Sequence, residues 1–190
     1  MTPEELWKEA TRGSQRAWES LYSLLGGKLY QFFLKNTSNQ ELAMDKTQEV
    51  FERLFKHRES FTDGNLKTWM FRIARNLLID HWRKKGKKVD LFGEETPEIP
   101  DDRVDVESGV LANIQHQEMV SLIDESLPAL SDEDRLVVGL VYLGGLAIPE
   151  LGQVMEIPLG TAKTRVRQAR LRLELIIREK LKNRGEARSI

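Results

Sequence analysis

The 190-residue sequence predicts an all-α fold in which two small helical domains are joined by an acidic flexible linker. Apolar residues recur at helical spacing along most of the chain, and no convincing alternating strand or hairpin turn interrupts them. An acidic stretch with two prolines at residues 90–108 breaks this periodicity. Because both flanking parts have the size of ordinary domains, we expect domains at residues 1–88 and 113–190 and the linker at 89–112.

The N-terminal half predicts several helices separated by turn residues. Helices are expected over residues 3–12 and 15–36, punctuated by Gly13 and by the Gly26-Gly27 pair. A third covers residues 39–61, where Leu42, Val50, Phe51, Leu54 and Phe55 supply apolar faces. After a polar turn, a long helix starts near Leu66 and runs into a basic segment at residues 83–88.

The C-terminal half has the outline of a helix-turn-helix. One helix ends near Pro128, and Ser131 followed by Asp134 resembles a capping box with Asp in place of Glu. The most hydrophobic stretch, residues 134–146, is the expected core helix. A short helix with Pro149 in its first turn, a compact turn and a longer helix then follow, which is the order of a helix-turn-helix.

Charge is strongly segregated although the net charge is -1. Residues 63–88 hold eight Lys or Arg against two Asp or Glu, residues 89–134 one against fourteen, and residues 135–190 eleven against five. Two basic blocks around an acidic one indicate two anion-facing surfaces. The chain has no cysteine, which excludes disulfides and thiolate zinc sites and fits the cytoplasm. We expect neither a signal peptide nor insertion into a membrane.

The long C-terminal helix divides into an apolar stripe and a basic outer face. The stripe, which we expect to face inward, consists of Ala162, Val166, Ala169, Leu173 and Ile177. Thr164, Arg167, Gln168 and Leu171 then point outward, with Lys163 and Arg170 on one flank and Arg165 and Arg172 on the other. This division suits the major groove, because central polar groups meet base edges and flanking cations meet phosphates. The backbone N–H groups of Gly160 and Thr161 suit a phosphate. A solvated basic face is the alternative, which the helix-turn-helix outline weakens.

The helix from Leu66 carries a second candidate surface. Its core stripe is Leu66, Met70, Ile73, Ala74 and Leu77, and a second face collects Trp69, Arg72, Asn76, Asp80 and Arg83. Aromatic and cationic groups on one face suit single-stranded nucleic acid, because bases stack on the rings while cations follow the backbone. Packing of tryptophan in the core is the competing interpretation, above all for Trp82.

Three segments together resemble the extracytoplasmic-function class of bacterial sigma factors. Residues 43–57 are similar to the polymerase-binding helix of that family, residues 66–85 to its promoter-melting and minus-10-reading helix, and residues 127–173 to its minus-35-reading domain. The resemblance covers nearly the whole chain, and it is specific because the segments occur together in the expected order and spacing.

The resemblance implies roles for individual residues. It implies polymerase contacts by Asp45, Gln48, Glu49 and Arg53. A loop at residues 60–65 would cradle a flipped minus-10 base, with minus-10 contacts from Phe61, Asn65, Lys67, Trp69, Arg72, Asn76 and Arg83. Minus-35 contacts would come from Gly160, Thr161, Lys163, Thr164, Arg165, Arg167, Gln168, Arg170 and Arg172. The implied partners are core RNA polymerase, promoter DNA and an anti-sigma factor, which is often membrane-anchored.

The sequence therefore predicts a non-enzymatic specificity subunit that directs core polymerase to promoters and needs no cofactor or metal. A stand-alone helix-turn-helix regulator that binds an operator as a dimer is the alternative. An enzyme such as a nuclease or phosphotransferase is disfavoured, because His57, His81 and His116 lack the spacing of metal ligands and no glycine-rich phosphate loop occurs. The sequence leaves open whether the chain alone is compact or extended.

Overall fold

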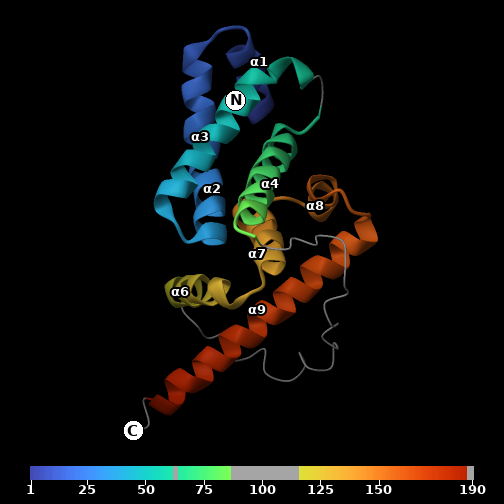
Figure 1. The fold of residues 1–190 in the computed structure, drawn as a ribbon. Helices are drawn as coiled ribbons and strands as arrows, with labels where there is room; N and C mark the ends of the chain where they lie inside the picture. Colours follow the sequence, from blue (N-terminus) through green and yellow to red (C-terminus); the bar gives the residue numbers. More distant parts are fainter. Residues whose placement is uncertain (62–63, 87–115, 188–190) are drawn as a thin grey trace.

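The computed structural model describes residues 1–61, 64–86 and 116–187, and every regular element in these ranges is a helix (Figure 1). The N-terminal domain contains α1 (Pro3–Thr11), α2 (Gln15–Thr37), α3 (Gln40–Lys56), the short η1 (Arg58–Ser60) and α4 (Leu66–Lys84). The C-terminal domain contains α6 (His116–Ser126), η3 (Leu127–Ala129), α7 (Asp132–Val138), the π-helical turn η4 (Gly139–Leu143), α8 (Ile148–Met155) and α9 (Leu159–Ala187). The predicted all-α class is confirmed, whereas the linker predicted at residues 89–112 lies outside the described residues.

Side-chain caps fix where the N-terminal helices begin. Thr2 and Glu5 form a capping box at α1, with the Glu5 N–H 3.2 Å from Thr2 Oγ1 and the Thr2 N–H 2.7 Å from Glu5 Oε2. The starts of α2, α3 and α4 are capped by the side chains of Ser14, Asn39 and Asn65. Each cap satisfies a backbone N–H that lacks a partner within its helix.

Helix α2 is continuous through the glycine pair, so the break expected at Gly26 and Gly27 is wrong. Each glycine inside a helix costs on the order of 1 kcal/mol relative to alanine. Burial on the same helix outweighs this cost, because Leu21, Leu29 and Phe32 are almost fully buried.

The core of the N-terminal domain lies between α2, α3 and α4, with α1 packed across α2 and α4. Phe32 and Phe71 meet edge to face at 5.6 Å between ring centroids. A second aromatic group joins α1 to the start of α4: Trp7 contacts Trp69 at 5.5 Å and Phe61 at 5.8 Å.

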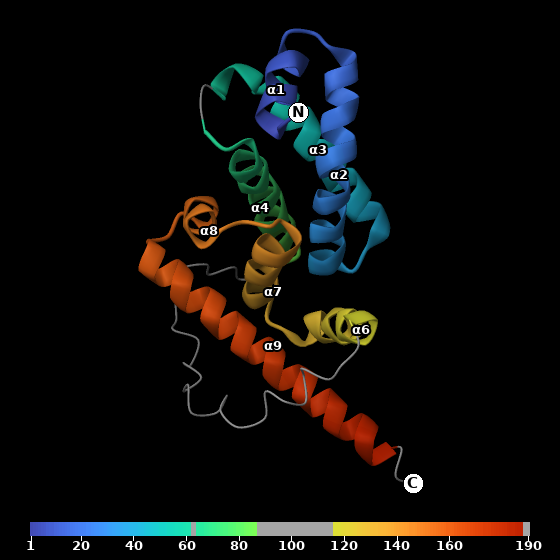
Figure 2. The same ribbon diagram turned by 180° about the vertical axis from the view of Figure 1, so that it is seen from behind.

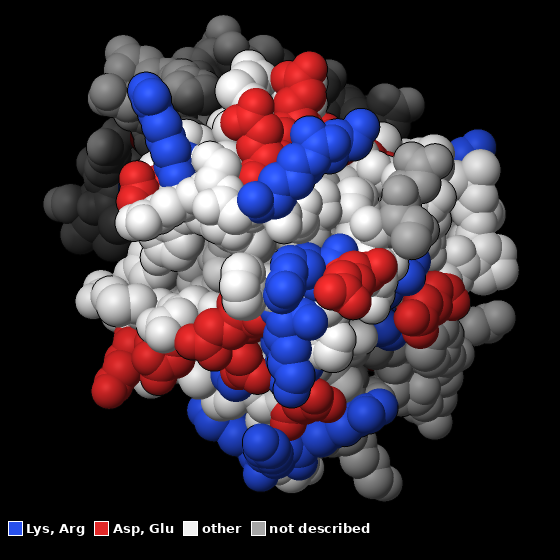
Figure 3. All heavy atoms as spheres, turned by 90° about the horizontal axis from the view of Figure 1, so that it is seen from above, with Lys and Arg blue, Asp and Glu red and all other residues white. Residues whose placement is uncertain are grey.

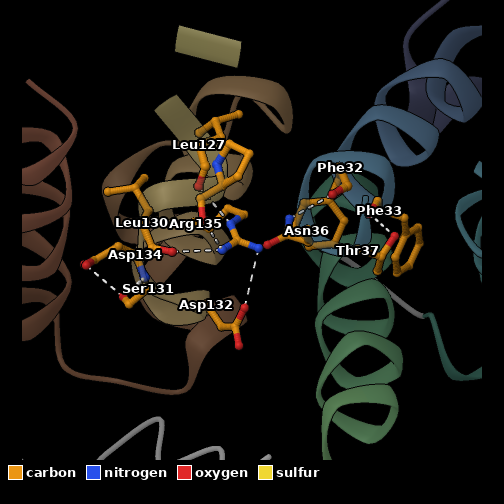
Figure 4. Close-up of polar contacts among 11 residues, drawn as sticks. Phe32, Phe33, Asn36, Thr37, Leu127, Leu130, Ser131, Asp132, Asp134 and Arg135 are labelled. Carbon is orange, nitrogen blue, oxygen red and sulfur yellow. Dashed lines mark hydrogen bonds and ion pairs between the residues drawn. The ribbon is translucent and has the colours of Figure 1, made fainter. Parts of the chain in front are cut away.

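In the C-terminal domain, Arg135 holds the turn between α6 and α7 (Figure 4). Its guanidinium donates to the backbone oxygens of Leu127 at 3.0 Å and Leu130 at 2.8 Å and lies 3.5 Å from Asp132. The planar fork of arginine suits this task, because one side chain serves several acceptors whose helix has ended.

Ser131 caps α7 as predicted, but the reciprocal half of a capping box is absent at this helix start. The Ser131 hydroxyl accepts from the Asp134 N–H at 3.1 Å and donates to Asp134 Oδ2 at 2.8 Å. The Asp134 side chain therefore bonds to the cap hydroxyl rather than to the cap backbone, because aspartate is one methylene shorter than the usual glutamate.

We expect Ser131→Ala to lower the free energy of unfolding of the C-terminal domain by about 1 kcal/mol, because the first turn of α7 loses its side-chain acceptor. Urea unfolding followed by circular dichroism measures this loss. The matched control is Ser121→Ala, since the Ser121 hydroxyl donates to Glu125 on an exposed face of α6 and caps no helix start. Equal losses in the two variants would contradict the capping role.

The two domains pack directly against each other. Helix α8 lies beside α4, and α7 with η4 lies beside α2, as both ribbon views show (Figures 1 and 2). Helix α9 crosses the far side of α7 and α8, and its C-terminal end projects away from the N-terminal domain (Figure 1). Seen from the α1 end, basic and acidic side chains are interspersed on the surface instead of forming a field of one sign (Figure 3).

Candidate nucleic-acid interface

Helices α8 and α9 form the predicted helix-turn-helix. Helix α8 begins with Pro149 in its first turn, and the Ala147 N–H donates to Glu150 Oε2 at 2.7 Å. Gly152 is needed where the turn folds back, because a Cβ there would lie 3.2 Å from the Ile157 oxygen. Glu156 ends α8 with a φ of 58°, a left-handed conformation that is uncommon outside glycine.

The first turns of α9 present most of the predicted minus-35 residues to solvent. Gly160, Thr161, Lys163, Thr164 and Arg170 are exposed, and Arg165, Arg167 and Arg172 are half-buried. The inward positions of Ala162, Ala169, Leu173 and Ile177 are confirmed, since all four are buried. The start of α9 is therefore a helix whose outer face is polar and basic.

The outward positions predicted for Gln168 and Leu171 are wrong, because they are only 4% and 1% exposed. A helical wheel drawn from one apolar stripe assumes that the helix packs on one side. Helix α9 instead contacts α7, α8 and α6 along its length. The Gln168 side chain is therefore covered by neighbouring helices in this structure, and it is not available to contact a base edge.

Two of the predicted flanking cations pair with α7. Arg165 Nη1 lies 3.2 Å from Glu133 Oε2, and Arg172 Nη1 lies 2.9 Å from Asp134 Oδ1. Asp134 is itself buried, so its pair with Arg172 is screened less than a surface pair. These ion pairs fix the crossing of α9 over α7, a structural task that the helical wheel did not predict.

Helix α4 carries the second predicted surface. Arg72, Asn76, Asp80 and Arg83 are exposed along one face, as their spacing predicts. Trp82 is 2% exposed and belongs to the core. Trp69 is half-buried, with its ring stacked on Phe61 at 5.2 Å and an interplanar angle of 23°. Thr62 and Asp63 of the predicted minus-10 loop lie outside the described residues.

Several predicted minus-10 residues also contact the C-terminal domain. The Asn65 side-chain amide donates to Glu150 of α8, and Lys67 Nζ donates to the Gly145 oxygen at 2.7 Å. Arg72 Nη2 lies 3.4 Å from the Gln153 oxygen. The structure therefore packs the predicted minus-10 surface of α4 against α8, the first helix of the helix-turn-helix.

Sequence reasoning missed Arg75, which is only 5% exposed between the domains. Its Nη1 lies 3.6 Å from Glu156 Oε2, and its Nη2 lies 3.5 Å from the Met155 oxygen. Burial lowers the pKa of Arg75, and the neighbouring Glu156 partly offsets this effect. The signal in the sequence is a cation four residues after Phe71, at a position that helical spacing brings toward the apolar face.

The predicted polymerase-binding residues lie on α3. Asp45 and Gln48 are exposed, while Glu49 accepts from Lys46 at 2.6 Å and from Arg53 at 2.7 Å. Partial burial by itself raises the pKa of Glu49, but the bonds from Lys46 and Arg53 outweigh it and lower the pKa overall.

Apolar side chains accompany this polar face of α3. Met44 is 62% exposed, and Phe55, one of the residues predicted to supply an apolar face, is 52% exposed. The guanidinium of Arg58 lies over the Phe55 ring at 4.7 Å. Polar groups beside exposed apolar ones are typical of a protein-binding surface.

The described ranges contain no group of three or more His, Cys, Asp or Glu side chains placed to hold a metal ion. In the same ranges, no helix is both long and apolar enough to span a bilayer.

Comparisons with known proteins agree with this arrangement. Residues 11–88 match the family model of sigma-70 region 2, and residues 121–173 match that of sigma-70 region 4. The chain is 33% identical over 178 residues to the ECF RNA polymerase sigma factor SigW of Bacillus subtilis, covering 90% of this chain and 95% of SigW. It is 30% identical over 158 residues to SigM of the same organism, covering 83% of this chain and 93% of SigM.

Solved structures share the fold. CnrH, solved in complex with the cytosolic domain of CnrY, aligns with a TM-score of 0.65 at 21% identity, covering 92% of this chain and 96% of CnrH. The sigma factor RpoE, solved with the anti-sigma factor NepR from Bartonella quintana, aligns with a TM-score of 0.61 at 20% identity, covering 85% of this chain and 96% of RpoE.

The chain has two helical domains, of which one contains a helix-turn-helix and the other a helix with basic and aromatic side chains. This combination indicates the class of DNA-binding transcription proteins. The two matched regions and the identity to SigW over nearly the whole length narrow this class further. The chain belongs to the extracytoplasmic-function family of RNA polymerase sigma factors. It is thus a non-enzymatic subunit that directs promoter recognition by RNA polymerase.

Proposed function

We propose that the start of α9 reads the minus-35 element and that the exposed face of α4 binds the minus-10 element. The observation that carries this proposal is the polar, exposed face of the second helix of the helix-turn-helix, which includes Lys163 and Thr164. Arg167 is the leading base reader, because its guanidinium can bond a guanine edge in bidentate fashion. Gly160, Thr161 and Arg170 contact the phosphate backbone.

On α4, the proposed minus-10 contacts are the exposed cations and amide of the stripe, Arg72, Asn76 and Arg83. Asn65 and Lys67 join them at the N-terminal end of the helix. Phe61 and Trp69 form a stacked pair next to the predicted base-binding loop. Both rings are half-buried, and they extend the surface on which an unpaired base can stack.

Polymerase binding belongs to the outer face of α3. Asp45 and Gln48 are its exposed polar members, Met44 and Phe55 are its exposed apolar ones, and Glu49 forms an ion pair with Arg53 on the same helix. An anti-sigma factor is the proposed restraining partner, since CnrH and RpoE were solved with the cytosolic domain of CnrY and with NepR. We place the chain in the cytoplasm, where polymerase and promoters are.

Adding the full chain to sigma-free bacterial core polymerase should produce run-off transcripts from specific promoters on genomic DNA. Asp45→Ala combined with Gln48→Ala should weaken polymerase binding about tenfold, because interface side chains of this kind contribute unequally but measurably. The matched control is Lys28→Ala, an exposed position on α2. Failure to bind polymerase, or tight palindromic operator binding without it, would refute the proposed function.

A further inference from the structure

Helix α1 contacts the proposed minus-10 surface, although most of it lies outside the part of the chain that matches sigma-70 region 2. The match begins at residue 11, whereas α1 spans Pro3–Thr11. The helix packs against α2 and α4 at the upper end of the N-terminal domain in both ribbon views (Figures 1 and 2). Its buried side chains are Leu6, Trp7 and Ala10. A segment that the family match does not include therefore packs beside a proposed DNA surface.

Trp7 contacts both rings of the minus-10 stacking pair, by which we mean Phe61 and Trp69. Its ring meets Phe61 edge to face at 5.8 Å and 80°, and it meets Trp69 at 5.5 Å and 82°. The two rings of the pair lie 5.2 Å apart at an angle of 23°. Because the Trp7 ring stands nearly perpendicular to two nearly parallel rings, one side chain restrains both members of the pair.

Trp7 is itself held in place by its surroundings. It is 3% exposed and meets Trp18 of α2 edge to face at 5.4 Å between ring centroids. The capping box of Thr2 and Glu5 fixes the first turn of the same helix. With so little exposure, the Trp7 ring is not available to contact a base. Its contribution to the minus-10 surface is therefore to position other side chains.

A second residue of α1, Glu4, contacts the backbone at the start of α4. The Leu66 N–H donates to Glu4 Oε1 at 3.3 Å. This N–H belongs to the first turn of α4, where backbone donors have no partner within the helix and the helix dipole favours a carboxylate. Helix α1 thus contacts the chain at Phe61 and again at Leu66 and Trp69.

These contacts order the stacking pair before any base arrives. A ring that is already in place binds an unpaired base more tightly than a mobile one, because no side-chain entropy is lost on binding. The Phe61 and Trp69 rings are half-buried, so each keeps an accessible part while Trp7 restrains it. The position of α1 therefore affects how well the pair can hold a base.

We propose that α1 positions the minus-10 stacking pair, with Trp7 as the positioning residue for the Phe61 and Trp69 rings and Glu4 as that for the start of α4. The inference rests on the proposed function, because the pair serves promoter recognition only if it receives an unpaired base. Neither Trp7 nor Glu4 is a proposed DNA contact. Loss of either should weaken the base contact without removing a DNA-binding group.

The functional test uses polymerase reconstituted with the full chain, on a promoter whose minus-10 non-template strand is already unpaired by mismatches. Single abasic sites along this strand identify the captured base. At that position the abasic site should lower transcription about tenfold with the unchanged chain, because one stack of a base on an aromatic ring is lost. With Trp7→Leu or Glu4→Ala the drop should be about threefold or less, since a base that is held less well contributes less.

Matched variants separate positioning from a general loss of stability. Trp7→Phe keeps an aromatic ring and Glu4→Gln keeps an acceptor for the Leu66 N–H, so both should stay near the drop of about tenfold. Glu9→Ala removes an exposed carboxylate of the same helix and should not change the drop. If Trp7→Leu and Glu4→Ala lower transcription from intact and abasic templates by the same factor, α1 only stabilises the domain and the proposal is overturned.

A conformational test needs neither polymerase nor DNA. In chain labelled with 5-fluorotryptophan, Trp69→Phe and Trp82→Phe assign the fluorine NMR signals of these two residues. The transverse relaxation of the Trp69 signal should show an exchange contribution in Glu4→Ala that is absent in the unchanged chain and in Glu4→Gln. The Trp82 signal, from a ring in the core, should stay sharp and reports that the domain is folded.

The two tests fail in different ways. A Trp69 signal that is as sharp in Glu4→Ala and Trp7→Leu as in the unchanged chain would overturn the positioning role, whatever the transcription result. If the unchanged chain gives no promoter-specific transcript, the proposed function fails, and the fluorine measurement alone decides whether α1 holds the stacking pair.

Discussion

Phe71→Ala should lower the free energy of unfolding of the N-terminal domain by about 3–5 kcal/mol, because removal of a fully buried ring leaves a cavity that the neighbours fill only partly. The Phe71 ring is 0% exposed and meets Phe32 edge to face at 5.6 Å. On its other side the ring approaches the backbone of the C-terminal domain, since a Cβ on Gly144 would lie 3.0 Å from Phe71 Cζ. Neither neighbour can collapse into the cavity without moving a helix.

Tryptophan fluorescence during urea unfolding measures this effect in the N-terminal domain alone, because all four tryptophans lie in residues 1–88. The matched control is Phe55→Ala, whose side chain is 52% exposed and should cost less than about 1 kcal/mol. A loss at Phe71 no larger than at Phe55 would contradict the position of this ring in the core.

Arg167→Ala should reduce discrimination at one or two minus-35 positions by about 1–3 kcal/mol, which is the value of a bidentate arginine contact with a base edge. Transcription from a set of promoters with single substitutions in the minus-35 element, at constant salt and saturating polymerase, measures the loss position by position. The preference at the position that Arg167 reads should flatten, while preferences elsewhere persist.

Two control variants distinguish a base-specific contact from a contact with the phosphate backbone. Lys163→Ala should weaken all promoters more evenly if that cation follows the phosphates, with a smaller salt dependence of binding. Lys182→Ala, an exposed cation near the C-terminal end of α9, should change neither. A uniform loss across all promoters in Arg167→Ala would assign that residue to the phosphate backbone instead.

Local patterns in the sequence were sufficient for most helices. The start of α7 follows from the predicted Ser131 cap, and the structure confirms its side-chain bond; α4 also begins at Leu66 as predicted. The exposed stripe of Arg72, Asn76 and Arg83 on α4 follows from spacing alone. These predictions agree with the structure because caps and helical spacing depend on residues within one or two turns of each other.

Predictions failed where burial came from distant segments. The glycine pair at Gly26 does not end α2, because packing of the surrounding leucines and phenylalanines outweighs glycine's low helix propensity. Gln168 and Leu171 are buried although the wheel directs them outward, since α9 is contacted from more than one side. Phe55 remains 52% exposed although its ring contacts Trp18 and Arg58, because these neighbours cover only part of it.

The amino-acid sequence alone determines the order of the helices, the helix-turn-helix and the two basic blocks. Each of these features depends on periodicity, caps or charge, which act between residues close in the sequence. Membership in the sigma-factor family follows from the same patterns. The burial of Arg75 against the end of α8, the pairing of Lys35 with Asp124 and the closure of one promoter-reading domain on the other emerge only in three dimensions. These contacts join residues about 80 or more positions apart. No local pattern in the sequence specifies which charged side chain becomes buried in such a contact.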